Sequence, residues 1–201
     1  MISIEFTITL KQLIQDRKRI LFLGIGENRM SDDGFGPYLS HRLLQQISTI
    51  TSKKQIKIIN GKTDYIERKP EILEFQPDLL LILDTCQPND NKPVTPGNLQ
   101  LNEESELVNW LPLSSHVLPI PVFISELKMN LPQLKTALIG IIPISTDYTD
   151  EVVQFQPEKY SLDDYDKDPD LPFYDFNLSP TIQKITDELV DILLELLKNT
   201  F

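Results

Sequence analysis

The sequence is poor in residues that build disulfide frameworks, metal clusters and nucleic-acid surfaces. Its 201 residues include one cysteine, Cys86, and two histidines, His41 and His116. A single cysteine excludes an internal disulfide and a zinc site made of several thiolates, and it favours a reducing compartment. The 19 lysines and arginines are outnumbered by 30 acidic residues, which gives a net charge of −11. That charge argues against nucleic acid and anionic membranes as partners.

Long apolar stretches are also missing. No run approaches the roughly 18 apolar residues that a membrane-spanning helix needs. The first residues contain an acidic side chain, Glu5, and no long apolar core, so we expect no signal peptide. Length and composition predict a cytoplasmic protein with a single domain over residues 1–201, which we expect to be a monomer.

Short apolar runs alternate with helical patterns along the chain. Four runs predict buried strands: 20–23, 55–59, 79–83 and 136–142. Five segments have helical spacing: 8–16, 35–47, 68–75, 119–130 and the stretch that follows Ser179 as N-cap. Residues 98–101 predict a short edge strand, and residues 103–110 a further helix. This alternation predicts a three-layer α/β fold, in which helices cover both faces of a twisted, mostly parallel sheet.

The first strand and the loop after it read RILFLGIGENRMSDDGFG, the densest group of signals in the chain. Gly24 and Gly26 follow the apolar run directly, where the chain must turn sharply. Asp32 and Asp33 come just before a helix, whose first turn favours acidic side chains. The third glycine of a dinucleotide-binding motif would fall at Arg29, so the spacing excludes that motif.

Two interpretations of the acidic pair remain open. In the first, Asp32 caps the helix and Asp33 merely interacts with the helix dipole. In the second, Asp33 meets Asp84 at the carboxyl edge of the sheet, where neighbouring parallel strands end. With His116, these carboxylates could hold a divalent cation such as nickel or zinc, or perform general acid/base chemistry without a metal. Structural roles compete with this: Asp84 could bond loop amides, and His116 could cap the following helix.

Other nucleophiles fit known signatures poorly. Ser114 and Ser115 lack the G-x-S-x-G setting of a hydrolase elbow. Cys86 lacks the surroundings of a cysteine-protease nucleophile, and we interpret it as a buried packing residue.

An acidic excursion, residues 145–178, interrupts the pattern before the last helix. It contains ten acidic residues and two lysines, a local charge of −8, with aromatic side chains between them. A loop of this length is usually functional or mobile. Two hypotheses follow: a partner-facing rim that attracts a basic surface, or a solvated spacer.

The motif L-G-I-G-x-N-x-x-S-D-D-G-F-G-P after the first strand resembles the opening of the [NiFe]-hydrogenase maturation endopeptidases. Within that family it is most similar to the hydrogenase 3 type and its archaeal relatives. Four further segments match in the family's order: Leu80–Asp84, Pro96-Gly97, Ser115–Pro119 and Leu138–Pro143. The resemblance covers about residues 8–143 and 179–198.

The resemblance implies a five-stranded sheet between helices and an aspartyl-type endopeptidase. Such an enzyme removes the C-terminal extension of a [NiFe]-hydrogenase large-subunit precursor after nickel has been inserted. By motif position, Asp33, Asp84 and His116 would recognise the nickel carried by the precursor, as both metal ligands and catalytic residues. Glu27 departs from the family, which has asparagine directly after the glycine turn. Two alternatives therefore stay open: a non-catalytic nickel-sensing or chaperone module, and an α/β hydrolase of another small substrate.

Overall fold

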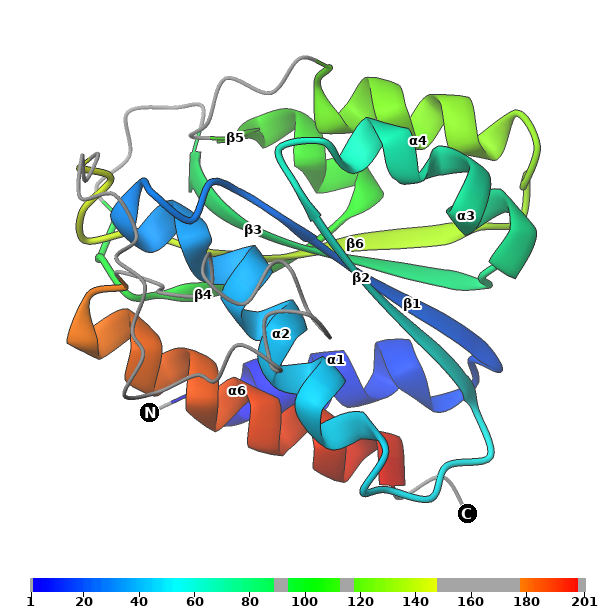
Figure 1. Cartoon of the computed structure of the whole chain (residues 1–201), viewed down its shortest axis with the longest axis horizontal. Helices are drawn as coiled ribbons and strands as arrows, with labels where there is room; N and C mark the ends of the chain where they lie inside the picture. Colours follow the sequence, from blue (N-terminus) through cyan, green and yellow to red (C-terminus); the bar gives the residue numbers. More distant parts are fainter. Residues whose placement is uncertain (1, 89–93, 113–117, 148–177, 199–201) are drawn as a thin grey trace, which may run out of the picture.

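The computed structural model of the chain describes residues 2–88, 94–112, 118–147 and 178–198. They form a sheet with a layer of helices on each face (Figure 1). The predicted three-layer α/β fold with a mostly parallel sheet is thus confirmed. No helix in these ranges is long and apolar enough to cross a membrane.

The main sheet has five strands in the order β2-β1-β3-β6-β4. Their bounds along the chain are β1 (Arg19–Ile25), β2 (Gln55–Lys62), β3 (Leu79–Pro88), β4 (Leu99–Glu103) and β6 (Lys135–Ile141). β2, β1, β3 and β6 run parallel, whereas the edge strand β4 is antiparallel to β6. A short strand, β5 (Trp110–Pro112), pairs antiparallel with the end of β3. β3 is therefore central, and its apolar residues 79–83 are fully buried, as expected of a parallel strand covered on both faces.

Two helical layers cover the sheet. One contains α1 (Ile4–Gln15), α2 (Phe35–Ile47) and α6 (Pro180–Lys198), and the other contains α3 (Lys69–Phe75) and α4 (Ile120–Lys128) (Figure 1). Successive side chains of a strand point to opposite faces, so each strand supplies both cores. Phe22 and Leu81 pack with the first layer, and Leu23 and Leu80 with the second.

Two strands extend furthest past the ends that the sequence predicted. β2 continues through Asn60 and Gly61, the pair interpreted as a turn, because Asn60 is still paired with Gly24 of β1. β3 continues past Asp84 to Pro88, because residues 86–88 pair with β5 after the parallel neighbours have ended. In β2 the Asn60-Gly61 pair, and in β3 the aspartate at position 84, did not end the strand, because a neighbouring strand was available for pairing beyond them.

Two helical predictions also need correction. α1 begins four residues earlier than expected, since the Ser3 hydroxyl accepts a hydrogen bond from the Phe6 amide and caps the helix there. Residues 104–109 form a 3₁₀ helix, η3 (Glu104–Asn109), followed directly by β5. Two further 3₁₀ turns, η1 (Ser31–Gly34) and η2 (Tyr65–Arg68), precede α2 and α3. α6 follows Ser179 as predicted.

Candidate active site

The loop between β1 and α2 can lie against the sheet only because of its glycines. Gly26 has a φ of +135°, and a Cβ there would lie 1.9 Å from the Asp33 carbonyl oxygen. A Cβ on Gly36 would lie 2.1 Å from the Leu83 carbonyl oxygen and 2.3 Å from that of Ile25. The start of α2 is therefore seated directly on β1 and β3, which brings Asp33 to the carboxyl end of the central strand.

Asp33 and Asp84 meet at this edge, as predicted, and Thr85 joins them. The Thr85 hydroxyl donates to Oδ1 of Asp33 at 2.7 Å, and the Thr85 amide donates to Oδ1 of Asp84 at 2.8 Å. The Glu27 amide donates to Oδ2 of Asp33 at 2.8 Å. Both aspartates are only 1% exposed. Two buried carboxylates are thus held at neighbouring positions by directed hydrogen bonds, an arrangement that suits a cation or a proton-transfer step.

The negative charge of Asp84 acts on two neighbouring side chains. Burial, reinforced by that charge, raises the pKa of Tyr65 to about 12. The same two causes raise the pKa of the Cys86 thiol. The Tyr65 hydroxyl donates to the Leu118 carbonyl, and its ring stands edge-on to Phe123 with centroids 5.1 Å apart. Both groups therefore stay protonated at neutral pH.

Cys86 is a buried free thiol that packs against the last parallel strand. A Cβ on Gly140 would lie 2.3 Å from its sulfur. Because the thiolate is the nucleophilic form, a raised pKa and close packing make Cys86 unreactive. Its interpretation as a packing residue is confirmed.

Asp32 does not cap the helix, so the first interpretation of the acidic pair is wrong. The residue before α2 is Gly34, and no side-chain hydrogen bond caps it. The Asp32 carboxylate instead accepts hydrogen bonds from the amides of Ile144, Ser145 and Ser179. Asp32 lies within η1, two residues before the N-cap position of α2, and its carboxylate binds distant backbone donors instead.

His116 lies outside the described residues, and so do residues 148–177 of the acidic excursion. Among the residues that are described, no three histidine, cysteine, aspartate or glutamate side chains form a group that could hold a metal ion. The first described residue after His116 is Leu118, whose carbonyl accepts a hydrogen bond from the Tyr65 hydroxyl.

Sequence reasoning missed the contacts of Thr85, Tyr65 and Asp32. Thr85 had an available signal, since it directly follows an aspartate at the expected end of a buried strand. Tyr65 and Asp32 had none, because their partners are 53 and up to 147 residues away in the chain.

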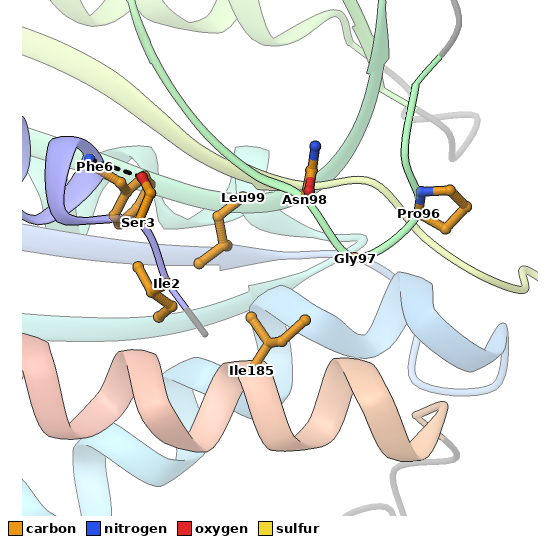
Figure 2. Close-up of a pocket in the computed structure, with 8 residues that line it drawn as sticks. All are labelled: Ile2, Ser3, Phe6, Pro96, Gly97, Asn98, Leu99 and Ile185. Atoms are coloured by element: carbon orange, nitrogen blue, oxygen red, sulfur yellow. Dashed lines mark hydrogen bonds between the residues drawn. The ribbon is translucent and has the colours of Figure 1, made fainter.

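A cavity of about 370 Å³ is lined by residues other than the carboxylate pair. It is enclosed by the start of α1, the segment leading into β4, and α6, and Ser3, Phe6 and Ile185 are among its lining residues (Figure 2). None of the described residues that line it has a charged side chain.

The fold and the carboxylate pair define a class: α/β proteins with acidic side chains at the carboxyl ends of parallel strands, where such folds bind ligands. More particularly, the chain is similar to the [NiFe]-hydrogenase maturation protease HycI of Thermococcus kodakarensis. The two structures share a TM-score of 0.67 and 22% identity over 95% of this chain and 99% of that one. The hydrogenase maturating endopeptidase HybD of Escherichia coli is similar with a TM-score of 0.59 and 21% identity, over 88% and 90% of the two chains.

One curated sequence relative agrees with these structures. A protein of Methanocaldococcus jannaschii, provisionally named a hydrogenase maturation protease, is 26% identical over 146 residues, or 69% of this chain and 83% of that protein. No protein-family model matches the sequence. The resemblance to hydrogenase maturation proteases that the sequence predicted is confirmed, and the structural likeness shows that the fold is shared.

Proposed function

We propose that this protein is an aspartyl-type endopeptidase of [NiFe]-hydrogenase maturation, acting as a cytoplasmic monomer. Its substrate is the precursor of a hydrogenase large subunit, from which it removes the C-terminal extension after nickel insertion. The observation that carries the proposal is the buried Asp33–Thr85–Asp84 arrangement on the fold of the maturation proteases. The proteases HycI and HybD, which share that fold, support the reaction class.

The chemistry of the carboxylate pair supports recognition of a cation on the substrate. Two aspartates that are 1% exposed are costly to keep charged unless a positive group approaches them. Carboxylate and imidazole ligands suit nickel, so His116 is the proposed third ligand. Nickel bound in the precursor would then complete its coordination with Asp33, Asp84 and His116 and polarise the scissile carbonyl beside it.

The hydrogen bond from Tyr65 to the Leu118 carbonyl supports this role for His116. It fixes the backbone two residues beyond the histidine to the layer that contains α4. A ligand supplied by a loop binds more tightly when the loop is anchored close by, because less conformational entropy is lost on binding.

Incubation of the purified protein with nickel-loaded precursor, followed by intact-mass measurement, tests the proposal. The parent protein should shorten the precursor, and Asp33→Asn, Asp84→Asn and His116→Ala should each abolish cleavage while remaining folded. Asp64→Asn is the matched control, because Asp64 is exposed and lies outside the carboxylate pair. Binding without cleavage by the parent protein would favour the non-catalytic nickel-sensing or chaperone alternative. Cleavage at the parent rate by the Asp84 or His116 variant would contradict metal recognition by these residues.

A further inference from the structure

Asp32, the neighbour of Asp33, has a buried carboxylate bound by donors from two distant segments. Its Oδ1 accepts from the Ser179 amide at 2.6 Å. Its Oδ2 accepts from the amides of Ile144 and Ser145 at 2.8 and 3.0 Å, and from the Ser179 hydroxyl at 2.9 Å. The Asp32 amide in turn donates to the Ser145 carbonyl at 3.1 Å. Asp32 is 0% exposed, and its four donors satisfy both of its buried carboxylate oxygens.

These bonds join three parts of the fold at the carboxyl edge of the sheet. Ile144 and Ser145 follow the end of β6, and Ser179 precedes α6, so Asp32 lies between the last parallel strand and the last helix. The side chain of Asp32 thus accepts hydrogen bonds from both segments. The turn η1 is therefore attached to the ends of β6 and α6 through Asp32.

The backbone of the turn shows why an attachment is needed. Ser31 has a φ of +45°, in the left-handed region that residues other than glycine rarely adopt. Such a conformation costs about 1–3 kcal/mol and persists only where surrounding contacts enforce it. Asp33, two residues on, donates its amide to the Met30 carbonyl at 3.0 Å and so belongs to the same turn.

We propose that Asp32 is a positioning residue, which holds the 31–34 turn against the ends of β6 and α6 and so places the Asp33 carboxylate beside Thr85. The structural part of this inference stands independently, and its kinetic part rests on the proposed function. Asp32 does not touch Asp84 or Thr85 in any described contact, so its effect on the reaction passes through Asp33.

Asp32→Asn is the informative variant because it keeps the shape of the side chain. Asparagine has an NH2 group in place of one carboxylate oxygen, and this group would face a backbone amide or the Ser179 hydroxyl that donated to that oxygen. At least one of the four hydrogen bonds is therefore lost. Ser179→Ala is a milder variant that removes the hydroxyl donor and keeps the backbone amide. Asp147→Asn is the matched control: Asp147 is exposed, follows the same strand, and accepts a hydrogen bond from the Ser145 hydroxyl at 2.7 Å.

Native-state hydrogen exchange tests the structural part without any substrate. Asp32→Asn should speed exchange of the Ser145 and Ser179 amides about tenfold or more, the effect of losing one charged hydrogen bond. In the same variant the Glu27 amide, which donates to Asp33, should also exchange about tenfold faster, while the amides of β1 keep their parent exchange rates. In the Asp147→Asn control, all of these amides should exchange at the parent rates. Faster exchange at Ser145 and Ser179 with an unchanged Glu27 amide would overturn the proposal, since Asp32 would then hold only its own partners. If Asp32→Asn fails to fold, Ser179→Ala should show the same pattern at smaller amplitude, and unchanged Glu27 exchange there would again overturn it.

Precursor cleavage tests the kinetic part. Asp32→Asn should lower kcat about tenfold with KM for the precursor unchanged, because the substrate still docks while Asp33 is misplaced. Ser179→Ala should lie between the parent and Asp32→Asn. An unchanged kcat, or a change confined to KM, would overturn the proposal. If the parent protein itself cleaves no precursor, the proposed function fails, and the exchange measurement alone still decides the role of Asp32.

Discussion

At the scale of single residues, Thr85 determines how the two carboxylates are held. Its hydroxyl and its amide bind different aspartates, so one residue fixes both sides of the pair. Loss of the amide contact would need a backbone change, whereas the hydroxyl contact depends on the side chain alone. The two contacts can therefore be separated by substitution.

Thr85→Val should impair cleavage of the precursor. Valine keeps the shape of threonine but leaves Oδ1 of Asp33 without its donor at 2.7 Å. Loss of a hydrogen bond to a charged group costs about 1.5–3 kcal/mol, so we expect a similar fall in stability and at least a tenfold fall in cleavage rate. Thr85→Ser keeps the hydroxyl and should stay near the parent rate. Urea unfolding and intact-mass kinetics measure the two effects, and parent-like cleavage by Thr85→Val would show that the bond is dispensable.

Tyr65 should make the stability of the protein sensitive to alkaline pH. Its pKa is raised from 10.0 to about 12, chiefly by burial, so the folded state favours the protonated phenol. The resulting stability is fully present below pH 10 and is lost as the pH rises through about 12. The difference in unfolding free energy between the parent and Tyr65→Phe should therefore shrink over this range. A difference that stays constant in urea titrations across these pH values would contradict the assignment.

At the scale of secondary-structure elements, the site depends on how closely α2 approaches the sheet. Gly36 belongs to that helix, yet its Cα faces two strand carbonyls rather than solvent. The approach places η1 and Asp33 over the end of β3. The same contact explains why the loop needs glycine at a helical position, where alanine is normally preferred.

Gly36→Ala should destabilise the protein, although the same change in an ordinary helix stabilises it by about 1 kcal/mol. A Cβ would lie 2.1 and 2.3 Å from backbone oxygens of Leu83 and Ile25, so α2 must move away from the sheet. We expect a loss of about 3 kcal/mol or more, in the range of severe overpacking, and loss of cleavage. Gln45→Ala, exposed on the same helix, should have little effect. Thermal unfolding of both variants gives the comparison, and a stable, active Gly36→Ala protein would contradict the close approach.

At the scale of the whole molecule, periodicity in the sequence predicted the layers and the sheet because burial follows local patterns. The apolar run 79–83 predicted a strand covered on both faces, and the glycine loop predicted the sheet edge at which Asp33 and Asp84 lie. The positions of Asp33 and Asp84 at one sheet edge agree with the topology expected from the sequence, whereas the metal-binding and catalytic roles of Asp33, Asp84 and His116 stay predictions. Contacts such as Asp32 with Ser179 could not be predicted, because no local pattern encodes a hydrogen bond across 147 positions.

The proposed reaction of the whole protein should depend on nickel in the precursor. Two buried carboxylates and one imidazole make an incomplete shell, so the isolated protein should bind nickel weakly until substrate thiolates complete it. Nickel-loaded precursor should be cleaved at least tenfold faster than nickel-free precursor under identical conditions. Equal rates for the two precursors, measured by intact mass, would exclude shared coordination as the basis of recognition.

The attachment of Asp32 to Ser179 also bears on protein synthesis. A nascent chain leaves the ribosome with the Asp33 loop complete long before Ser179 has been translated, and two of the four donors to Asp32 are then absent. During that interval only Ile144 and Ser145 can hold the strained turn at Ser31 through Asp32. The turn that carries Asp33 is therefore fully attached only after translation has passed Ser179.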